Sequence, residues 1–300
     1  MLLDSASLYF RAFFGVPARS DGAPIPTNAV RGFTDMIATL VNDHRPTHLV
    51  ACWDNDWRPA FRVAAIPSYK AHRLTPGSDV QEESPEDLTP QVPVIVDLLA
   101  AVGVCRVGSD GYEADDVIGT LATGASGPVD IVTGDRDLFQ LVDDAAGVRV
   151  LYTAKGGVRA PDIIDQAALL QRYGVRTGAQ YADLATLRGD TSDGLPGVSG
   201  VGEKTAATLI GRYGDLSGLR AALADGDSGF TPSQRTKLHA AGDYLDVAPE
   251  VVQVVRDVPL PADLDPALPS TVADPERLID LIETYRIGNP VSRLLAALGI

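Results

Sequence analysis

Short apolar runs alternate with longer amphipathic segments along the first half of the chain. The apolar runs, which are typical of buried strands, span residues 1–4, 47–54, 129–135 and 148–152. Apolar residues recur at helical spacing over residues 29–44, 90–103 and 113–124. Because strand and helix patterns alternate, the sequence predicts an α/β fold with a mostly parallel sheet flanked by helices.

The pattern changes near residue 165 to helices separated by glycine-rich turns. Helical segments that each end in glycine span residues 167–174, 180–189, 203–214 and 216–226. Residues 251–261 predict a returning strand, and residues 275–287 predict a late amphipathic helix. The polar residues 72–91 predict a mobile excursion, since about 20 residues exceed a usual connection.

Acidic side chains end three of the predicted strands, at Asp4, Asp54 and Asp135. Parallel sheets gather ligand chemistry outside the carboxyl ends of their strands, so these aspartates should meet at one edge. Further carboxylates occur in short clusters elsewhere in the chain, at Glu113, Asp115, Asp116, Asp137, Asp190 and Asp193. Carboxylates gathered without counter-charge are costly, and hard divalent cations such as Mg²⁺ or Mn²⁺ are the natural compensation.

Each acidic cluster also has an ordinary structural explanation. Acids near residue 113 complement the dipole of the helix that starts there, and Asp135 with Asp137 suits an Asx-type turn. Because all of these explanations would have to hold at once, we interpret the carboxylates as one metal site suited to phosphate chemistry.

A glycine-rich segment, residues 197–205, leads into a predicted helix. Gly197, Gly200 and Gly202 permit a tight hairpin, and backbone N–H groups at the start of the helix favour phosphate. Lys204 and Thr205 can add a charge and a hydroxyl to the same phosphate. The segment resembles helix-hairpin-helix elements that hold DNA backbones without reading bases. A simple turn between two helices is the alternative.

Residues 57–78 contain cations and no acid. The candidates for phosphate contacts are Arg62, Lys70 and Arg73, and those for stacking on a base are Tyr69 and Phe61. A solvated helix face explains the same residues. Arg11 is a further cation close in sequence to Asp4.

Composition narrows the possible functions. The 300 residues, 45% of them hydrophobic, suffice for one large domain or two smaller ones. No apolar run approaches the roughly 18 residues of a membrane helix, and the N-terminus lacks a signal-peptide pattern, so we expect a cytoplasmic protein. The sequence holds no phosphate-binding P-loop and no serine nucleophile elbow. Cys52 and Cys105 suit buried, reduced thiols.

The net charge of −15, from 40 acidic and 25 basic residues, argues at first against nucleic-acid binding. The clustered acids contribute more than half of this excess, however, and bound divalent ions would neutralise part of it. We therefore expect a localised contact surface for a polyanion, with strong salt dependence.

Five motifs, taken in order, closely resemble those of the bacterial 5′-nuclease family. They are LLDSASLYFRAF, FRVAAIPSYKAHR, GYEADDVIGTLA, TGDRDLFQLV and GDTSDGLPGVSGVGEKTA. The family includes the N-terminal nuclease domain of DNA polymerase I, stand-alone 5′→3′ exonucleases and flap endonucleases. The resemblance covers essentially the whole chain, and the lack of polymerase sequence downstream makes it look like a free-standing member.

The resemblance implies a PIN-like (Rossmann-like) core over residues 1–165 with a mobile arch around 70–92. Residues 166–300 would hold a helix-three-turn-helix region that binds duplex DNA and a return to the core. The implied metal carboxylates are Asp4, Asp54, Glu113, Asp115, Asp116, Asp135, Asp137, Asp190 and Asp193. The implied basic and aromatic positions are Lys70 at the arch base, Arg73 and Arg62 nearby, Arg11 after the first strand, and Tyr69. The glycine hairpin matches an element that often holds a monovalent cation such as K⁺.

The implied activity is structure-specific cleavage of DNA with two or more Mg²⁺ or Mn²⁺ ions. It combines 5′→3′ exonuclease and 5′-flap endonuclease action, leaves 5′-phosphate products and serves replication and repair. The implied partners are DNA with 5′ ends, flaps, nicks or gaps, and RNA–DNA primers, for a nucleoid-associated monomer that contacts no membrane. Asp116→Ala or Asp135→Ala should then abolish cleavage while the chain still folds. The alternatives are a PIN-type ribonuclease and a catalytically silent DNA-binding scaffold.

Two positions depart from the family pattern. Gly194 stands where the family commonly has Asn, which should alter a local turn more than the chemistry. The arch is acidic, whereas an arch that threads a single strand should be basic. Its acids are Asp79, Glu82, Glu83, Glu86 and Asp87.

Overall fold

A six-stranded sheet forms the centre of the computed structural model, which describes residues 1–19, 22–79 and 81–300. The strands are β1 (Leu2–Asp4), β2 (Val50–Trp53), β3 (Cys105–Gly108), β4 (Val129–Thr133), β5 (Val148–Tyr152) and β6 (Asp162–Ile164). Their order is β3-β2-β1-β4-β5-β6, and every neighbouring pair is parallel except β5 with β6. The predicted α/β fold with a mostly parallel sheet is confirmed.

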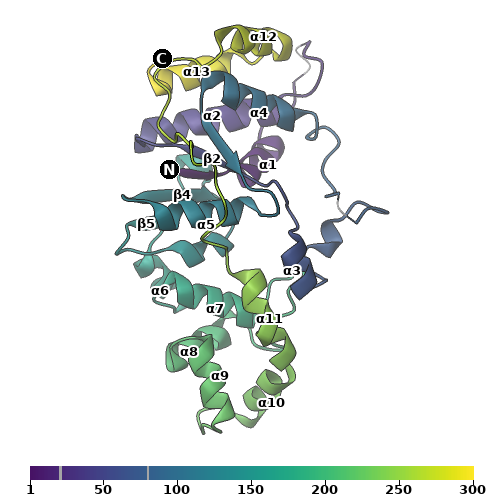
Figure 1. Ribbon diagram of the computed structural model, residues 1–300, viewed down its shortest axis with the longest axis vertical. Coiled ribbons are helices and arrows are strands. Elements are labelled where there is room, and N and C mark those ends of the chain that lie inside the picture. The colour runs from purple at the N-terminus through teal and green to yellow at the C-terminus, as the bar shows by residue number, and fades with distance from the viewer. Residues whose placement is uncertain (20–21, 80) are drawn as a thin grey trace.

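Helices cover both faces of this sheet (Figure 1). One layer contains α1 (Ser5–Gly15), α2 (Asn28–His44), α4 (Gln91–Val102), α12 (Pro275–Tyr285) and α13 (Gly288–Leu298). The opposite face is covered by α5 (Ala114–Gly124) and the 3₁₀ helix η2 (Asp137–Leu141). Successive strand residues such as Leu2 and Leu3 enter the two cores in turn. Burial on both faces explains why the strands are almost continuously apolar.

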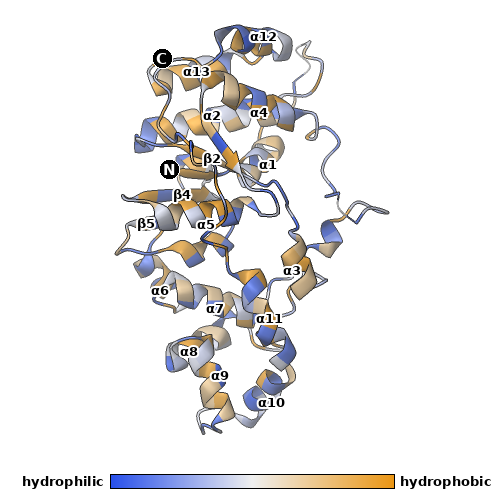
Figure 2. Ribbon diagram, in the orientation of Figure 1, coloured by the Kyte–Doolittle hydropathy of each residue, from blue (hydrophilic) through white to orange (hydrophobic). Residues whose placement is uncertain are grey.

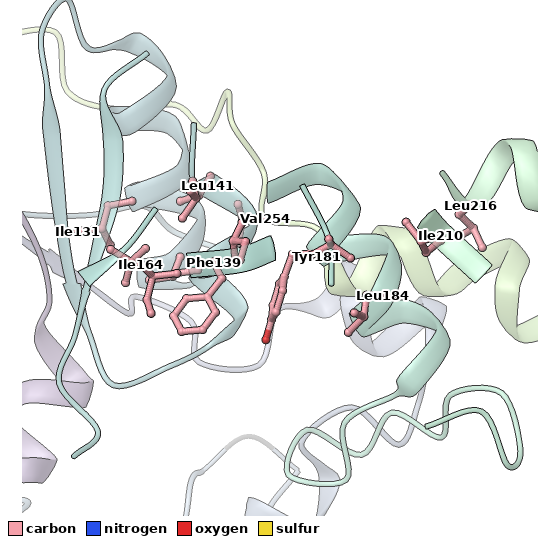
Figure 3. Close-up of a cluster of buried hydrophobic side chains, with 14 of the residues drawn as sticks. Ile131, Phe139, Leu141, Ile164, Tyr181, Leu184, Ile210, Leu216 and Val254 are labelled. Atoms are coloured by element: carbon pink, nitrogen blue, oxygen red, sulfur yellow. The ribbon is translucent and has the colours of Figure 1, made fainter. Parts of the chain in front are cut away.

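The helical second half shares its hydrophobic core with one face of the sheet. Its helices are α6 (Gln166–Tyr173), α7 (Gly178–Arg188), α8 (Glu203–Tyr213), α9 (Leu216–Ala224), α10 (Pro232–Ala240) and α11 (Gly242–Val252). Figure 3 shows this cluster running from Ile131 in β4 through Phe139 and Tyr181 to Ile210 in α8. Because close packing resists displacement, the shared core fixes α7 and α8 relative to the sheet.

The predicted strand at residues 251–261 is wrong. Helix α11 extends to Val252, and the segment that follows forms no strand. The backbone amides of this segment donate to side chains and not to a neighbouring strand. Their acceptors are Gln140 for Val254, Asp116 for Val255 and Thr120 for Val258. The chain then runs past the sheet to α12 (Figure 1). The elements β3, β6, α1, α10, α11 and α13 were not expected from the sequence patterns.

The segment between α3 (Ala60–Ala65) and α4 forms a small hairpin on one side of the molecule (Figure 1). It begins with a 3₁₀ turn, η1 (Ala71–Arg73), and closes through a bridge between Leu74 and Glu82. Figure 2 shows hydrophobic residues concentrated in the central strands and hydrophilic ones along this excursion. A third 3₁₀ helix, η3 (Gly157–Arg159), follows β5. Within the described residues, no helix has the length and apolar character needed to cross a bilayer.

Candidate active site

A cavity of about 470 Å³ opens where β1, β2 and β4 end. The three aspartates that follow these strands, Asp4, Asp54 and Asp135, all line it, as expected for the edge of a parallel sheet. Its other charged lining residues are Lys70, Arg73, Glu82, Glu113 and Asp115. The cavity thus combines carboxylates from distant parts of the sequence with two cations.

Local hydrogen bonds hold the strand-end aspartates in place. Asp4 caps helix α1 by accepting from the Ser7 amide at 3.1 Å, and its other oxygen accepts from Thr133 Oγ1 at 2.6 Å. Asp54 accepts from the amide of Ala114 at the start of α5, at 2.8 Å. Asp135 closes an Asx turn by accepting from the Asp137 amide at 2.9 Å. Asp135 therefore both forms the Asx turn and lines the cavity, so the two explanations for this residue are compatible.

Burial perturbs the acidity of several of these carboxyls. It raises the pKa of Asp4 to about 7, against the opposing hydrogen bond from Thr133. Burial is also the main cause that raises the pKa of Asp54, and that of Asp115 well above its ordinary value, with nearby carboxylates adding to both effects. Such shifts mean that the fold gathers negative charge with too little compensation, which a bound cation would supply.

Glu113 is the meeting point of the cations and the acids. It is buried, and it accepts from Lys70 Nζ, from Tyr69 Oη at 2.7 Å and from Arg62 Nη1 at 2.5 Å. Arg62 and Tyr69, which were expected to contact DNA, are instead directed at Glu113 inside the protein. Both side chains are almost fully buried, at 2% and 4% exposure.

Asp116 is a structural carboxylate and lies outside the cavity, contrary to the expectation that it binds metal. It has no exposed surface, and its two oxygens accept from Arg62 at 2.6 and 2.8 Å. They also accept from the amides of Glu113 and Val255. Because Arg62 also donates to the carbonyl of Val251, this ion pair joins α3, α5 and the end of α11.

The base of the arch is fastened to the loop that follows α7. The Lys70 amide donates to the Asp193 carbonyl, and Arg73 Nη2 donates to Asp193 Oδ1 at 2.5 Å. Gly194 has a φ of 73°, and a Cβ there would lie 2.1 Å from the carbonyl oxygen of Ser68. The departure at this position is thus tied to a close backbone approach, which only glycine permits.

Besides Asp116, four of the predicted catalytic and metal-binding residues do not line the cavity. Arg11 donates to the carbonyl of Ala154 at 3.2 Å. Asp190 accepts from the Ser192 amide at 2.8 Å, and Asp193 pairs with Arg73. Burial raises the pKa of Asp137, with Asp135, Asp193 and Asp190 as the nearby charges that add to the shift. A second acidic group, Asp137 with Asp190 and Asp193, therefore adjoins the cavity.

The acidic cavity matches divalent ions by the chemistry of its donors. Among residues 1–19, 22–79 and 81–300, no three His, Cys, Asp or Glu side chains are arranged to hold one ion together. Several carboxylate oxygens are instead turned to protein donors, as at Asp4 and Glu113. The set is nevertheless all-oxygen and acidic, which is the ligand chemistry that Mg²⁺ and Mn²⁺ require.

The glycine hairpin lies between α7 and α8, as predicted. Gly197 and Gly200 adopt φ values of 63° and 69°, and Gly202 caps α8. Lys204 and Thr205 fall in the first turn of that helix. A Cβ at Gly200 would lie 2.5 Å from Nζ of Lys237 in α10, so the missing side chain makes room for this ammonium group.

Two residues of the site were missed by sequence reasoning. Lys237 lies about forty residues from the hairpin that it adjoins, and no motif contains it. Glu82 was noted only as an arch acid, but it forms a bridge with Leu74 and lines the cavity together with Lys70 and Arg73. Its place beside those two cations could not be inferred from sequence spacing.

Comparisons with known proteins agree on the kind of protein that this is. Residues 1–174 match the family described as 5′-3′ exonuclease, N-terminal resolvase-like domain, and residues 176–276 match the 5′-3′ exonuclease, C-terminal SAM fold. A 5′-3′ exonuclease of Streptomyces coelicolor is 59% identical over 304 residues, which cover 99% of each chain.

Two solved structures share the fold at low sequence identity. The T5 D15 protein co-crystallized with metal ions matches with a TM-score of 0.66 and 16% identity, over 99% of this chain and 98% of that one. The catalytic core of Rad2 in complex with a DNA substrate matches with a TM-score of 0.63 and 19% identity, over 99% and 92%. The fold, the acidic cavity and these matches together define a nuclease of the 5′-3′ exonuclease class. The chain belongs to the 5′-3′ exonuclease family.

Proposed function

We propose that this nuclease hydrolyses DNA at 5′ ends and 5′ flaps, with divalent ions held in the acidic cavity. The observation that carries the proposal is the convergence of Asp4, Asp54, Asp115 and Asp135 with Lys70 on one cavity at the sheet edge. Metal ions are named for the T5 D15 structure, and a DNA substrate is named for the Rad2 core. Both features suit the chemistry of this cavity.

Mg²⁺ or Mn²⁺ is the proposed metal, and two or more ions are expected. The proposed ligands are Asp4, Asp54, Glu113, Asp115 and Asp135, with Asp137, Asp190 and Asp193 as an adjoining set. Bound ions would activate a water and stabilise the leaving oxygen in an in-line displacement. Asp116 is left out of this set because Arg62 and backbone amides occupy its oxygens.

Lys70 and Arg73 are the proposed phosphate-binding cations of the cavity. Both line it, and each is held by a carboxylate, Lys70 by Glu113 and Arg73 by Asp193. These pairs aim the cations before substrate arrives, so little reorganisation is needed when charge develops on the phosphate. Arg11 is proposed to act on the arrangement of the loop after β5 through its bond to Ala154.

The glycine hairpin is the proposed contact to duplex DNA. Gly197, Gly200 and Gly202 allow the backbone to approach a phosphate, and Lys204 and Thr205 stand at the first turn of α8. We add Lys237 to this contact because it adjoins Gly200. A monovalent cation such as K⁺ at the hairpin belongs to the same proposal.

The wider setting of the activity is also a proposal. Residues 1–165 would form the nuclease core, with the arch around 70–92, and residues 166–300 the duplex-binding region and the return to the core. The expected substrates are flaps, nicks, gaps and RNA–DNA primers in replication and repair. A monomer associated with the nucleoid in the cytoplasm is the expected form.

One assay tests the function directly. A labelled 5′ flap, a nicked duplex and a single strand are each incubated with Mg²⁺, Mn²⁺ or EDTA. We expect metal-dependent cleavage at the flap junction, with 5′-phosphate products. Cleavage that persists in EDTA, or that is confined to RNA, would contradict the proposal.

The acid cluster predicts a pH-dependent stability for the metal-free protein. The pKa of Asp4 lies at about 7 in the folded chain against an ordinary value of 3.8, so the native state binds more protons between these limits. The free energy of unfolding must then fall as pH rises through this window. We expect the Tm in EDTA to be higher at pH 5 than at pH 8, and Mg²⁺ to raise the Tm more at pH 8.

Asp4→Asn is the control for this prediction. It removes the group whose pKa is raised to about 7, so the slope of Tm against pH should flatten. A metal-free Tm that is constant or rises from pH 5 to pH 8 is incompatible with the proposed cause.

Glu82→Gln should strengthen DNA binding. The Glu82 carboxylate lines the cavity that must receive a phosphodiester, and removing its charge removes a repulsion of about 1 kcal/mol after screening. We expect the Kd for flap DNA in EDTA to fall about fivefold. Glu83→Gln is the matched control, because Glu83 is the next arch residue, exposed and outside the cavity. Equal effects of the two variants would show that arch charge in general is responsible.

A further inference from the structure

A second polar pocket lies beside the acidic cavity, where β4 and β5 end. Its volume is about 560 Å³, and it is lined by Arg136, Tyr152, Lys155, Asp162, Arg172 and Tyr173. None of these residues lines the acidic cavity. The pocket was not marked by any motif, since its members come from β5, β6, α6 and the loops after β4 and β5.

The pocket is cationic in a chain of net charge −15. Its lining holds the cations Arg136, Lys155 and Arg172 against the single carboxylate of Asp162. Arg172 Nη1 donates to Asp162 at 2.9 Å, while Lys155 is exposed. The lining residues thus carry an excess of positive charge, partly opposed by Glu203 at 4.0 Å from Arg136, and this excess favours an anionic ligand.

The basic stretch predicted to bind phosphate is largely engaged within the protein. Arg58 donates to the carbonyls of Tyr69 and Pro67, and Arg62 is buried against carboxylates. Lys70 and Arg73 pair with Glu113 and Asp193. Of this stretch only Lys70 and Arg73 line the acidic cavity, so contacts to DNA beyond the cavity must come from cations elsewhere in the chain.

Position links this pocket to both parts of the proposed DNA path. Arg136 directly follows Asp135, which lines the acidic cavity, and precedes Asp137. Its Nη1 also lies 4.0 Å from Glu203, the first residue of α8, which follows the glycine hairpin. A strand held at the hairpin and cleaved at the cavity would pass between these two points.

The two tyrosines that line the pocket pack against a buried phenylalanine. The rings of Tyr152 and Tyr173 lie 5.0 and 5.9 Å from that of Phe139. Phe139 is fully buried in the core that joins the sheet to α7 (Figure 3). Side chains supported in this way hold a ligand site in shape before the ligand binds.

We propose that the pocket formed by Arg136, Lys155 and Arg172 binds a backbone phosphate of the DNA strand between the hairpin and the acidic cavity. This inference rests on the proposed function. It assigns part of the substrate contact to the end of β5 and the end of α6, outside the arch and the hairpin. The contact is electrostatic, so it contributes affinity and salt dependence without base specificity.

The test uses the double variant Lys155→Gln/Arg172→Gln, which leaves Arg136 beside the acids untouched. Arg149→Gln is the matched control, because Arg149 of β5 forms a similar exposed pair with Asp130. Fluorescein-labelled 5′-flap DNA is titrated in EDTA over a salt series. We expect the Kd of the double variant to rise about tenfold and its slope of log Kd against log salt to shrink by about two, with the control unchanged. Arg172→Lys should retain most of the affinity.

The outcomes separate this proposal from the proposed function. A wild-type protein that neither binds nor cleaves flap DNA contradicts the function itself. If the wild type binds and cleaves but the double variant has the affinity and slope of the control, the phosphate pocket is wrong and the function stands. A third outcome is that free dTMP inhibits the wild type but not the double variant, while the two proteins bind DNA equally well. This result would assign the pocket to a product nucleotide and would also overturn the proposal.

Discussion

The Asp135→Asn variant is expected to cleave a 5′-flap substrate about 10³-fold more slowly than the wild type while folding normally. Asp135 is exposed, lines the acidic cavity and follows the central strand β4. Its Oδ1 accepts from the Asp137 amide, and an asparagine side chain retains this acceptor. The substitution thus removes one charge from the cavity and leaves the turn intact. Single-turnover rates with Mg²⁺ and excess enzyme measure the effect without interference from product release.

Asp143→Asn provides a close control for this variant. Asp143 closes the same kind of turn, with its Oδ1 accepting from the Ala145 amide at 2.9 Å, and it lies outside the cavity. Its cleavage rate should stay within about twofold of the wild type. A normal rate for Asp135→Asn, or an equal loss for both variants, would remove Asp135 from the site.

Asp116→Ala should destabilise the protein by about 3–5 kcal/mol. The carboxylate is fully buried, and its removal leaves the Arg62 guanidinium in the interior without its main partner. The amides of Glu113 and Val255 lose their acceptors at the same time. The sequence-based expectation that this variant folds but fails to cleave is therefore replaced by a loss of stability, measured by urea unfolding in EDTA.

The adjacent variant Asp115→Ala separates the two explanations. Asp115 shares helix α5 but lines the cavity, and burial raises its pKa well above the ordinary value. Removing a carboxylate whose charged form is disfavoured should leave metal-free stability unchanged or raised at pH 8. Similar destabilisation by both variants would show that the helix start, and not the Arg62 pair, is what matters.

Sequence patterns predicted the sheet and its acidic edge because both depend on local order. Apolar runs that end in aspartate identify strands and the edge where they finish, so the amino-acid order alone sufficed to place Asp4, Asp54 and Asp135 together. The order of the motifs also predicted the glycine hairpin between two helices. These features require no knowledge of which distant side chains meet.

Burial and distant partners explain what the sequence did not reveal. Arg62, Tyr69 and Asp116 have the composition of a binding site, but they satisfy one another inside the protein. The apolar residues 251–261 have a strand pattern, yet their amides find acceptors on Asp116, Thr120 and Gln140. The cationic pocket joins residues from three elements and two loops, none of which carries a signal alone.

The core shared by the sheet and the helices limits where this chain can be recombined with a relative. The two family segments meet between residues 174 and 176, but Phe139 on one side packs against Tyr173 and Tyr181 on either side of that junction, with ring centroids 5.9 and 5.3 Å apart. The boundary between the two family segments therefore does not separate two hydrophobic cores. Recombination between relatives at this point would separate Phe139 and Tyr173 from Tyr181, so a folded chimaera needs aromatic residues that match across the junction.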